Sequence, residues 1–197
     1  LEFRRVLFRS IYQGEELGMT NPHFSRITDY RDVESLNMFA ELRASGREPD
    51  ELLAILASKS RDNGRTPMQW DASHNAGFTE GEPWIGVCDN YETVNARAAL
   101  DDADSVFYTY QSLIRLRKTL SVLTWGDYED LLPDHPSLWC YRRQWQGQTL
   151  MVVANLSRER QQWQPDPVQG AWRVALGNYD DVPSRPNARL LRPFEIG

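Results

Sequence analysis

Apolar residues recur at helical spacing in three stretches of the chain before about residue 119. This period predicts helices over residues 28–45, 49–58 and 105–118. Asp29 or Asp32 is expected at the start of the first helix, where an acidic side chain suits the N-terminal end of the dipole. The third helix has the most regular apolar face, and we expect that face to be packed in a core.

Beyond about residue 119 the period of the apolar positions changes from helical to two. The alternation predicts a hairpin in which residues 138–145 and 148–156 are joined by a turn at Gln146-Gly147. Further strands are expected over residues 125–132, 171–176 and 188–194. Strands that follow helices in this way indicate a second, all-β domain that begins near residue 119.

Five aromatic residues of the second half allow two interpretations. They can form a platform on which sugar rings stack, or they can pack in the core of the β domain. We favour the core for most of them, because strands favour aromatic residues in any case. The five are Trp139, Tyr141, Trp145, Trp163 and Trp172.

The loop over residues 60–70 is unusually rich in charged and aromatic side chains. It reads Ser-Arg-Asp-Asn-Gly-Arg-Thr-Pro-Met-Gln-Trp, with a turn signal at Asn63-Gly64 and a helix-stopping proline at Pro67. Such a loop is typical of a binding loop on a rigid scaffold, although a surface loop held by one Arg–Asp pair has the same composition. The irregular stretch 71–103 that follows is long enough to line a ligand site or to brace the scaffold.

Composition and charge argue against several classes of protein. The 197 residues carry a formal net charge of −6, which disfavours nucleic acid as a partner. Cys88, Cys140 and the scattered histidines lack metal-ligand spacing, and no P-loop or dinucleotide fingerprint is present, so we expect neither metal nor cofactor. The cysteine usage suits the cytoplasm, and no apolar run is long enough to cross a membrane.

The first residues of the chain look unlike the start of a protein. Residues 1–10 read Leu-Glu-Phe-Arg-Arg-Val-Leu-Phe-Arg-Ser, and their last five match what read-through of a sequencing adapter encodes. We therefore expect this segment to be foreign to the protein. Ile11 to Met19 reads instead as the end of a strand that feeds a glycine-punctuated turn.

Five short blocks follow one another along the rest of the first half. They read Ile-Tyr-Gln-Gly-Glu-Glu-Leu-Gly-Met, Tyr-Arg-Asp-Val-Glu, Ser-Arg-Asp-Asn-Gly-Arg-Thr-Pro-Met-Gln-Trp-Asp, Asn-Ala-Gly-Phe and Gly-Glu-Pro-Trp. In this order they resemble the α-glucosidases of the α-amylase superfamily, in particular the oligo-1,6-glucosidase group. Later blocks, such as Leu-Trp-Cys-Tyr-Arg-Arg and Ala-Asn-Leu-Ser-Arg-Glu, are similar to members that hydrolyse trehalose 6-phosphate.

The resemblance implies an α/β fold followed by an all-β one. Residues 11–118 would form the C-terminal part of a (β/α)8 catalytic barrel, and residues 119–197 an antiparallel β-sandwich. It also implies a retaining glycosidase, whose Asp nucleophile and Glu acid/base lie about 5 Å apart. In the family these carboxylates come from barrel strands that precede the position of Ile11. We therefore expect no catalytic residue in this chain and no hydrolase activity from it alone.

Four residues match family positions that handle substrate. Arg61 matches the arginine that binds the non-reducing sugar, where a planar fork of donors suits sugar hydroxyls and a carboxylate together. Glu34 matches a residue that accepts hydrogen bonds from the second sugar. Arg65 and Glu16 are weaker candidates, for which support of neighbouring groups is the favoured role. The implied partner is a small sugar phosphate, and its phosphate contacts stay unassigned.

Three functions remain open at this point. The favoured one is part of a hydrolase that converts trehalose 6-phosphate to glucose and glucose 6-phosphate. The second is part of an oligo-1,6-glucosidase or another α-glucosidase, and the third is a non-catalytic carbohydrate-binding β-sandwich. Sugar affinity of residues 119–197 alone would favour the third.

Overall fold

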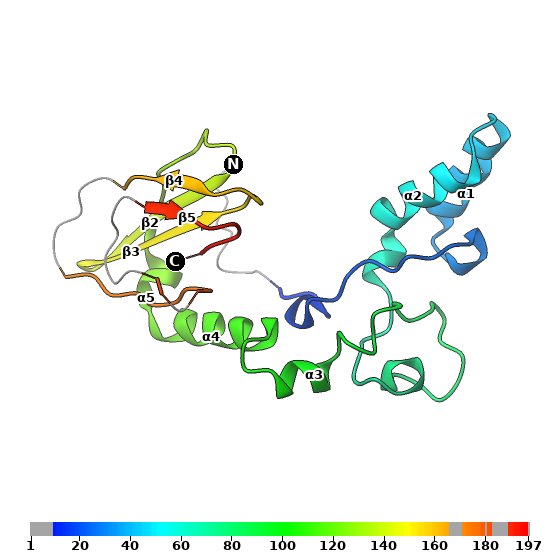
Figure 1. Cartoon of the computed structure of the whole chain (residues 1–197), viewed down its shortest axis with the longest axis horizontal. Helices are drawn as coiled ribbons and strands as arrows, with labels where there is room; N and C mark the ends of the chain where they lie inside the picture. Colours follow the sequence, from blue (N-terminus) through cyan, green and yellow to red (C-terminus); the bar gives the residue numbers. More distant parts are fainter. Residues whose placement is uncertain (1–9, 166–170, 180, 183–188, 197) are drawn as a thin grey trace. The chain divides into compact units, whose positions relative to one another are not determined.

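The computed structural model describes residues 10–165, 171–179, 181–182 and 189–196. The described chain divides into two units, Ser10–Tyr110 and the residues from Gln111 onward (Figure 1). The segment 1–10, predicted to be foreign, lies outside the described residues apart from Ser10. The division falls inside a helix, so the domain boundary predicted near residue 119 stays a prediction.

The first α-helix of the first unit is α1 (Val33–Ala44), which starts later than the predicted residue 28. Asp32 caps this helix by accepting the N–H of Ser35 at 3.0 Å, and Gly46, with φ of 95°, follows its end. The prediction that Asp32 can supply the N-terminal acid is confirmed. The apolar stripe of this helix is only partly buried, since Val33 is exposed.

The next helices are α2 (Pro49–Lys59) and the short α3 (Ala96–Asp101). α2 agrees with its prediction to within one residue at its end, and it packs against α1 with Leu52 and Leu56 fully buried. α3 was not predicted. Asn95 starts it by accepting the N–H of Ala98 at 2.8 Å, which interrupts the long irregular stretch.

The expected strand end at Ile11 is wrong. The chain there turns at Gly14, which has φ of 90°, into a 3₁₀ helix over Glu15–Leu17. The described residues of the first unit contain no β-strand. A strand exists only when a neighbour pairs with its main chain, and within the described residues none lies beside Ile11.

The second unit contains two further helices and five strands among its described residues. The helices are α4 (Val106–Thr119), which begins in the first unit, and α5 (Ser121–Trp125). The strands are β1 (Asp127–Asp130), β2 (Leu138–Trp145), β3 (Gln148–Asn155), β4 (Gln161–Trp163) and β5 (Arg189–Leu191). They form two antiparallel sheets, one in the order β1-β2-β3 and one pairing β4 with β5.

Both sheets contribute to one apolar core. In β2 the buried Leu138 and Cys140 flank the exposed Trp139, as alternation predicts, whereas β3 ends in three consecutive buried residues, Val153–Asn155. The β4-β5 sheet adds a tryptophan and a leucine to the same cluster. Its members are Leu138, Cys140, Val153, Trp163 and Leu191.

Several predictions for this half need correction. Residues 171–176 form no strand, and the first residue of the predicted strand 188–194 lies outside the described residues. Trp163 is buried, as predicted for most of the five aromatic residues. Trp139 is exposed, and its ring contacts that of Tyr141 with centroids 5.0 Å apart. The other three aromatic residues are half-buried.

The apolar face of α4 is not the packed core that the sequence predicts. Val106, Leu113 and Ile114 are all exposed in the structure. The helix itself agrees closely with its prediction, so the periodicity identified the element correctly but not what covers it. None of the described helices is long and apolar enough to span a bilayer.

The β2–β3 turn provides a test of the hairpin. Gln146 and Gly147 both have positive φ, 46° and 78°, as the two central residues of a type I′ turn require. Asparagine tolerates this conformation better than glutamine, so Gln146→Asn is expected to raise the free energy of unfolding by about 0.5 kcal/mol. Urea unfolding measures the gain, with Gln148→Asn in the adjoining strand as the control. A loss of stability in Gln146→Asn would contradict the assignment.

Candidate functional site

The 3₁₀ helix η3 (Arg61–Gly64) brings an arginine to the N-terminus of α1. The Ser60 hydroxyl starts this turn by accepting the N–H of Asp62 at 3.2 Å. Arg61 Nη2 then lies 2.9 Å from Asp32 Oδ1 and 3.0 Å from Glu34 Oε2. Two of the four predicted site residues, Arg61 and Glu34, are therefore in direct contact.

The two carboxylates that hold Arg61 differ in exposure. The Asp32 side chain is 5% exposed and that of Glu34 is 78% exposed, while the Arg61 side chain is 58% exposed. Both of these contacts use Nη2, one of the three nitrogens of the guanidinium group. The arginine is thus held by two carboxylates while more than half of its side chain stays accessible to a ligand.

Asp62 is the buried link between the loop and α1. Its Oδ2 accepts the N–H of Arg31 at 2.7 Å and that of Asp32 at 2.8 Å. These bonds hold residues 31–32 in extended conformation, which explains why α1 begins at Val33 and not at residue 28. A contact thirty residues away in sequence therefore sets the start of the helix.

Arg65 lies between the same two aspartates. Its Nη1 is 3.8 Å from Asp32 Oδ1 and 3.7 Å from Asp62 Oδ1, distances of ion pairs and not of hydrogen bonds. It therefore offsets their negative charge without fixing their orientation. This position fits the supporting role predicted for it.

The environment changes the acidity of two groups here. Burial raises the pKa of Asp32, but the two hydrogen bonds from Ser35 and the charge of Arg61 outweigh it and leave the pKa below its ordinary value. Asp32 is therefore ionised at neutral pH. Burial raises the pKa of Tyr30, and the negative charges of Asp62 and Asp29 add to the increase.

Glu16 does not join this cluster. Its Oε2 accepts the N–H of Gly14 at 2.9 Å, across the turn at the start of the chain. The neighbouring Gln13 side chain reaches the carbonyl of Thr66 at 3.5 Å, which brings this turn near the end of the loop. Among its described contacts Glu16 supports its own turn.

Sequence reasoning missed Asp62 and gave Asp32 only a capping role. A signal was present, because Asp62 stands in the run Arg-Asp-Asn-Gly-Arg and Asp32 directly follows Arg31. Carboxylates placed among arginines in two separate loops indicate that the loops pair. The pattern does not reveal which carboxylate is buried.

The cluster can bind a polar ligand, but it is not a hydrolytic centre. Its three carboxylates and two guanidinium groups leave a net charge of −1, and the carboxylates are engaged by arginines. Among the described residues no group of three His, Cys, Asp or Glu side chains is placed to hold a metal ion.

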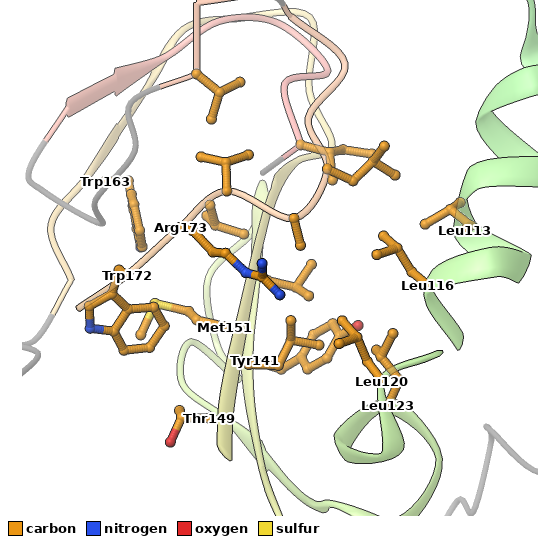
Figure 2. Close-up of a pocket in the computed structure, with 18 of the residues that line it drawn as sticks. Leu113, Leu116, Leu120, Leu123, Tyr141, Thr149, Met151, Trp163, Trp172 and Arg173 are labelled. Atoms are coloured by element: carbon orange, nitrogen blue, oxygen red, sulfur yellow. The ribbon is translucent and has the colours of Figure 1, made fainter. Parts of the chain in front are cut away.

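A second feature is an apolar cavity of about 220 Å³ in the second unit. Figure 2 shows Leu113 and Leu116 of α4 on one side and Trp163 and Trp172 on the other. Its lining contains no carboxylate and none of the predicted site residues, so it offers no acid or base for hydrolysis.

Residues 8–126, more than half of the chain, match the family model described as alpha amylase, catalytic domain. The chain belongs to the α-amylase family. Within this family it is 68% identical over 185 residues to a trehalose-6-phosphate hydrolase of Escherichia coli, covering 94% of this chain and 34% of that protein. It is 44% identical over 188 residues to an oligo-1,6-glucosidase of Halalkalibacterium halodurans, covering 94% of this chain and 34% of that protein.

A solved α-amylase-family structure shares the fold. The trehalose-6-phosphate hydrolase of Bacillus licheniformis superimposes with a TM-score of 0.90 and 45% identity, covering 94% of this chain and 34% of that one. The chain thus spans about a third of the length of the relatives it matches.

Proposed function

We propose that the chain is part of an α-glucosidase that hydrolyses trehalose 6-phosphate to glucose and glucose 6-phosphate. The observation that carries this proposal is the 68% identity to the E. coli trehalose-6-phosphate hydrolase, against 44% to the H. halodurans oligo-1,6-glucosidase. Residues 11–118 would complete a (β/α)8 barrel, and residues 119–197 would form a β-sandwich. Cys88 and Cys140 are both buried and are not joined in a disulfide, which supports a cytoplasmic location.

The chain would contribute residues that bind the sugar substrate. Arg61 binds hydroxyls of the non-reducing glucose through Nη1 and Nε, and Glu34 accepts hydrogen bonds from the second sugar. Arg65 and Glu16 support the site without touching the substrate. The net charge of −1 on the Arg61 cluster favours neutral hydroxyls over a phosphate, so the phosphate is bound by residues outside it.

Bond cleavage would use carboxylates from the part of the enzyme that this chain does not include. A retaining mechanism needs a nucleophile and an acid/base about 5 Å apart on either side of the glycosidic bond. The carboxylates at Arg61 are held by guanidinium groups and serve binding. The chain alone is therefore expected to be inactive.

A chimera tests this function directly. The matching third of the E. coli relative is replaced by residues 11–197, and release of glucose 6-phosphate from trehalose 6-phosphate is measured. The chimera is expected to be active, while the isolated chain releases no glucose 6-phosphate. Activity of the isolated chain would contradict the proposed division of roles.

The same chimera separates the two enzyme candidates. A chain from an oligo-1,6-glucosidase would support hydrolysis of an α-1,6-linked glucose disaccharide at the expense of trehalose 6-phosphate. We expect the opposite preference. The unmodified E. coli enzyme is the reference for both substrates.

A further inference from the structure

Asp62 is a fully buried carboxylate to which the proposed function gives no role. It is 0% exposed, and its Oδ1 has no hydrogen-bond partner among the described residues. Burying a carboxylate is costly unless it is hydrogen-bonded, and Asp62 meets that need only at Oδ2, which accepts the N–H groups of Arg31 and Asp32. We propose that Asp62 is a positioning residue for Arg61, acting through the main chain of Asp32. The proposal rests on the proposed function, because it assigns Arg61 a substrate to bind.

Two contacts join η3 to Asp32 at the start of α1. The Asp32 N–H donates to Asp62 Oδ2 at 2.8 Å, and the Asp32 carboxylate accepts from Arg61 Nη2 at 2.9 Å. Arg61 and Asp62 are neighbours in η3, so Asp32 is bound at its main chain and at its side chain by consecutive residues. Movement of Asp32 away from Asp62 would therefore also move the oxygen that orients Arg61.

Asp32 is the contact that orients Arg61, and Glu34 is not. Glu34 and Arg61 are both largely exposed, and an exposed pair between flexible side chains holds its geometry weakly. Asp32 is buried, caps α1 and accepts the N–H of Ser35 and its hydroxyl at 3.0 and 2.8 Å. A rigid acceptor of this kind reduces the freedom that Arg61 loses when it binds a ligand.

Asp62 acts through its two main-chain hydrogen bonds and not through its charge. Its Oδ1 approaches Arg65 only to 3.7 Å, whereas Oδ2 accepts two N–H groups at 2.7 and 2.8 Å. Asparagine can keep the two acceptor bonds with its carbonyl oxygen while losing the charge. Alanine loses both. The two substitutions therefore separate positioning from electrostatics.

The test is a double-mutant cycle in the chimera with trehalose 6-phosphate as substrate. Asp62→Ala is expected to raise KM about tenfold with a smaller change in kcat, and Asp62→Asn to stay within threefold of the unsubstituted chimera. In the Arg61→Ala background, Asp62→Ala is expected to cause no further loss of kcat/KM, because the group that it positions is gone. Asp29→Ala, which removes a partner of the exposed Arg26, is the control and should leave KM unchanged.

Each outcome decides the matter. Equal losses of kcat/KM from Asp62→Ala with and without Arg61 would mean that Asp62 has a structural role alone. An unchanged KM in Asp62→Ala, or an equal effect of Asp62→Asn, would also overturn the proposal. An active chimera with these results contradicts the positioning role only, whereas an inactive unsubstituted chimera contradicts the proposed function and the positioning role with it. If Asp62→Ala does not fold, Asp62→Ser replaces it in the cycle, since its hydroxyl fills part of the space.

Discussion

Replacing Arg61 with alanine in the chimera is expected to lower kcat/KM for trehalose 6-phosphate by about 100-fold. Hydrogen bonds to a charged group contribute about 1.5–3 kcal/mol, and about 1.4 kcal/mol corresponds to a factor of ten. Nη2 of Arg61 is held by carboxylates, and the Nη1 and Nε donors are the ones proposed to bind the substrate. Steady-state kinetics with trehalose 6-phosphate measure the loss. Lysine at this position is expected to recover only part of it, because it lacks the planar fork of donors.

The matched control is another exposed Arg–Glu pair in the same unit. Arg47 Nη1 lies 3.0 Å from Glu51 Oε1, the same distance that joins Arg61 to Glu34. Arg47→Ala removes a charge of the same kind just before α2 and should change kcat/KM less than twofold. A loss of less than threefold in Arg61→Ala, or an equal loss in the control, would contradict a role of Arg61 in substrate binding.

Elements whose structure depends on nearby residues are predictable from this sequence. α2 follows from Pro49 at its start and from Leu52 and Leu56 on one side. The β2–β3 hairpin follows from alternating residues around Gln146-Gly147, and the register across it is regular from end to end. In both cases the pattern and the turn residues agree, so the local signal is sufficient.

Elements whose structure depends on residues distant in the sequence are not predictable from the sequence. Asp32 marks the start of α1 locally, but Asp29 offers the same signal, and the bonds from the Arg31 and Asp32 N–H groups to Asp62 that favour the later start are not visible in the sequence. Residues 171–176 alternate like a strand, but no described strand pairs with them. Likewise the apolar face of α4 predicts the helix and cannot say what covers it.

The candidate site shows the same division. The resemblance to a family located Arg61 and Glu34, and the structure brings these two together at Asp32. Asp62 was missed because its importance lies in burial and in two main-chain bonds, neither of which is visible in residue types. Glu16 was included for its place in a motif, yet its described contact is with Gly14.

Replacing Glu195 with alanine is expected to cost the second unit about 3 kcal/mol, the lower end for a broken buried pair, because two partly buried arginines then lose a shared carboxylate. Glu195 is 2% exposed, and its oxygens lie 3.2 Å from Arg189 Nη2 and 2.9 Å from Arg192 Nε. Its carbonyl also accepts the N–H of Asn155 at 2.8 Å, which ties this segment to the end of β3. Hydrogen exchange at the Asn155 and Leu191 amides measures the loss within this unit, separately from the first.

The dependence on pH distinguishes this ion cluster from simple packing. Burial raises the pKa of Glu195, but hydrogen bonds from Arg192 and the charges of both arginines lower it by more. The pKa of Glu195 in the folded state therefore lies below its value in the unfolded state. The stability that ionised Glu195 supplies is therefore present above the unfolded pKa and is lost as the pH falls through the folded pKa. Protection in the wild type should approach that of Glu195→Gln as the solution is acidified, and a gap independent of pH would mean that packing alone is lost. Glu129→Ala, which breaks the more exposed pair with Arg142, is the control and should cost less than about 1 kcal/mol.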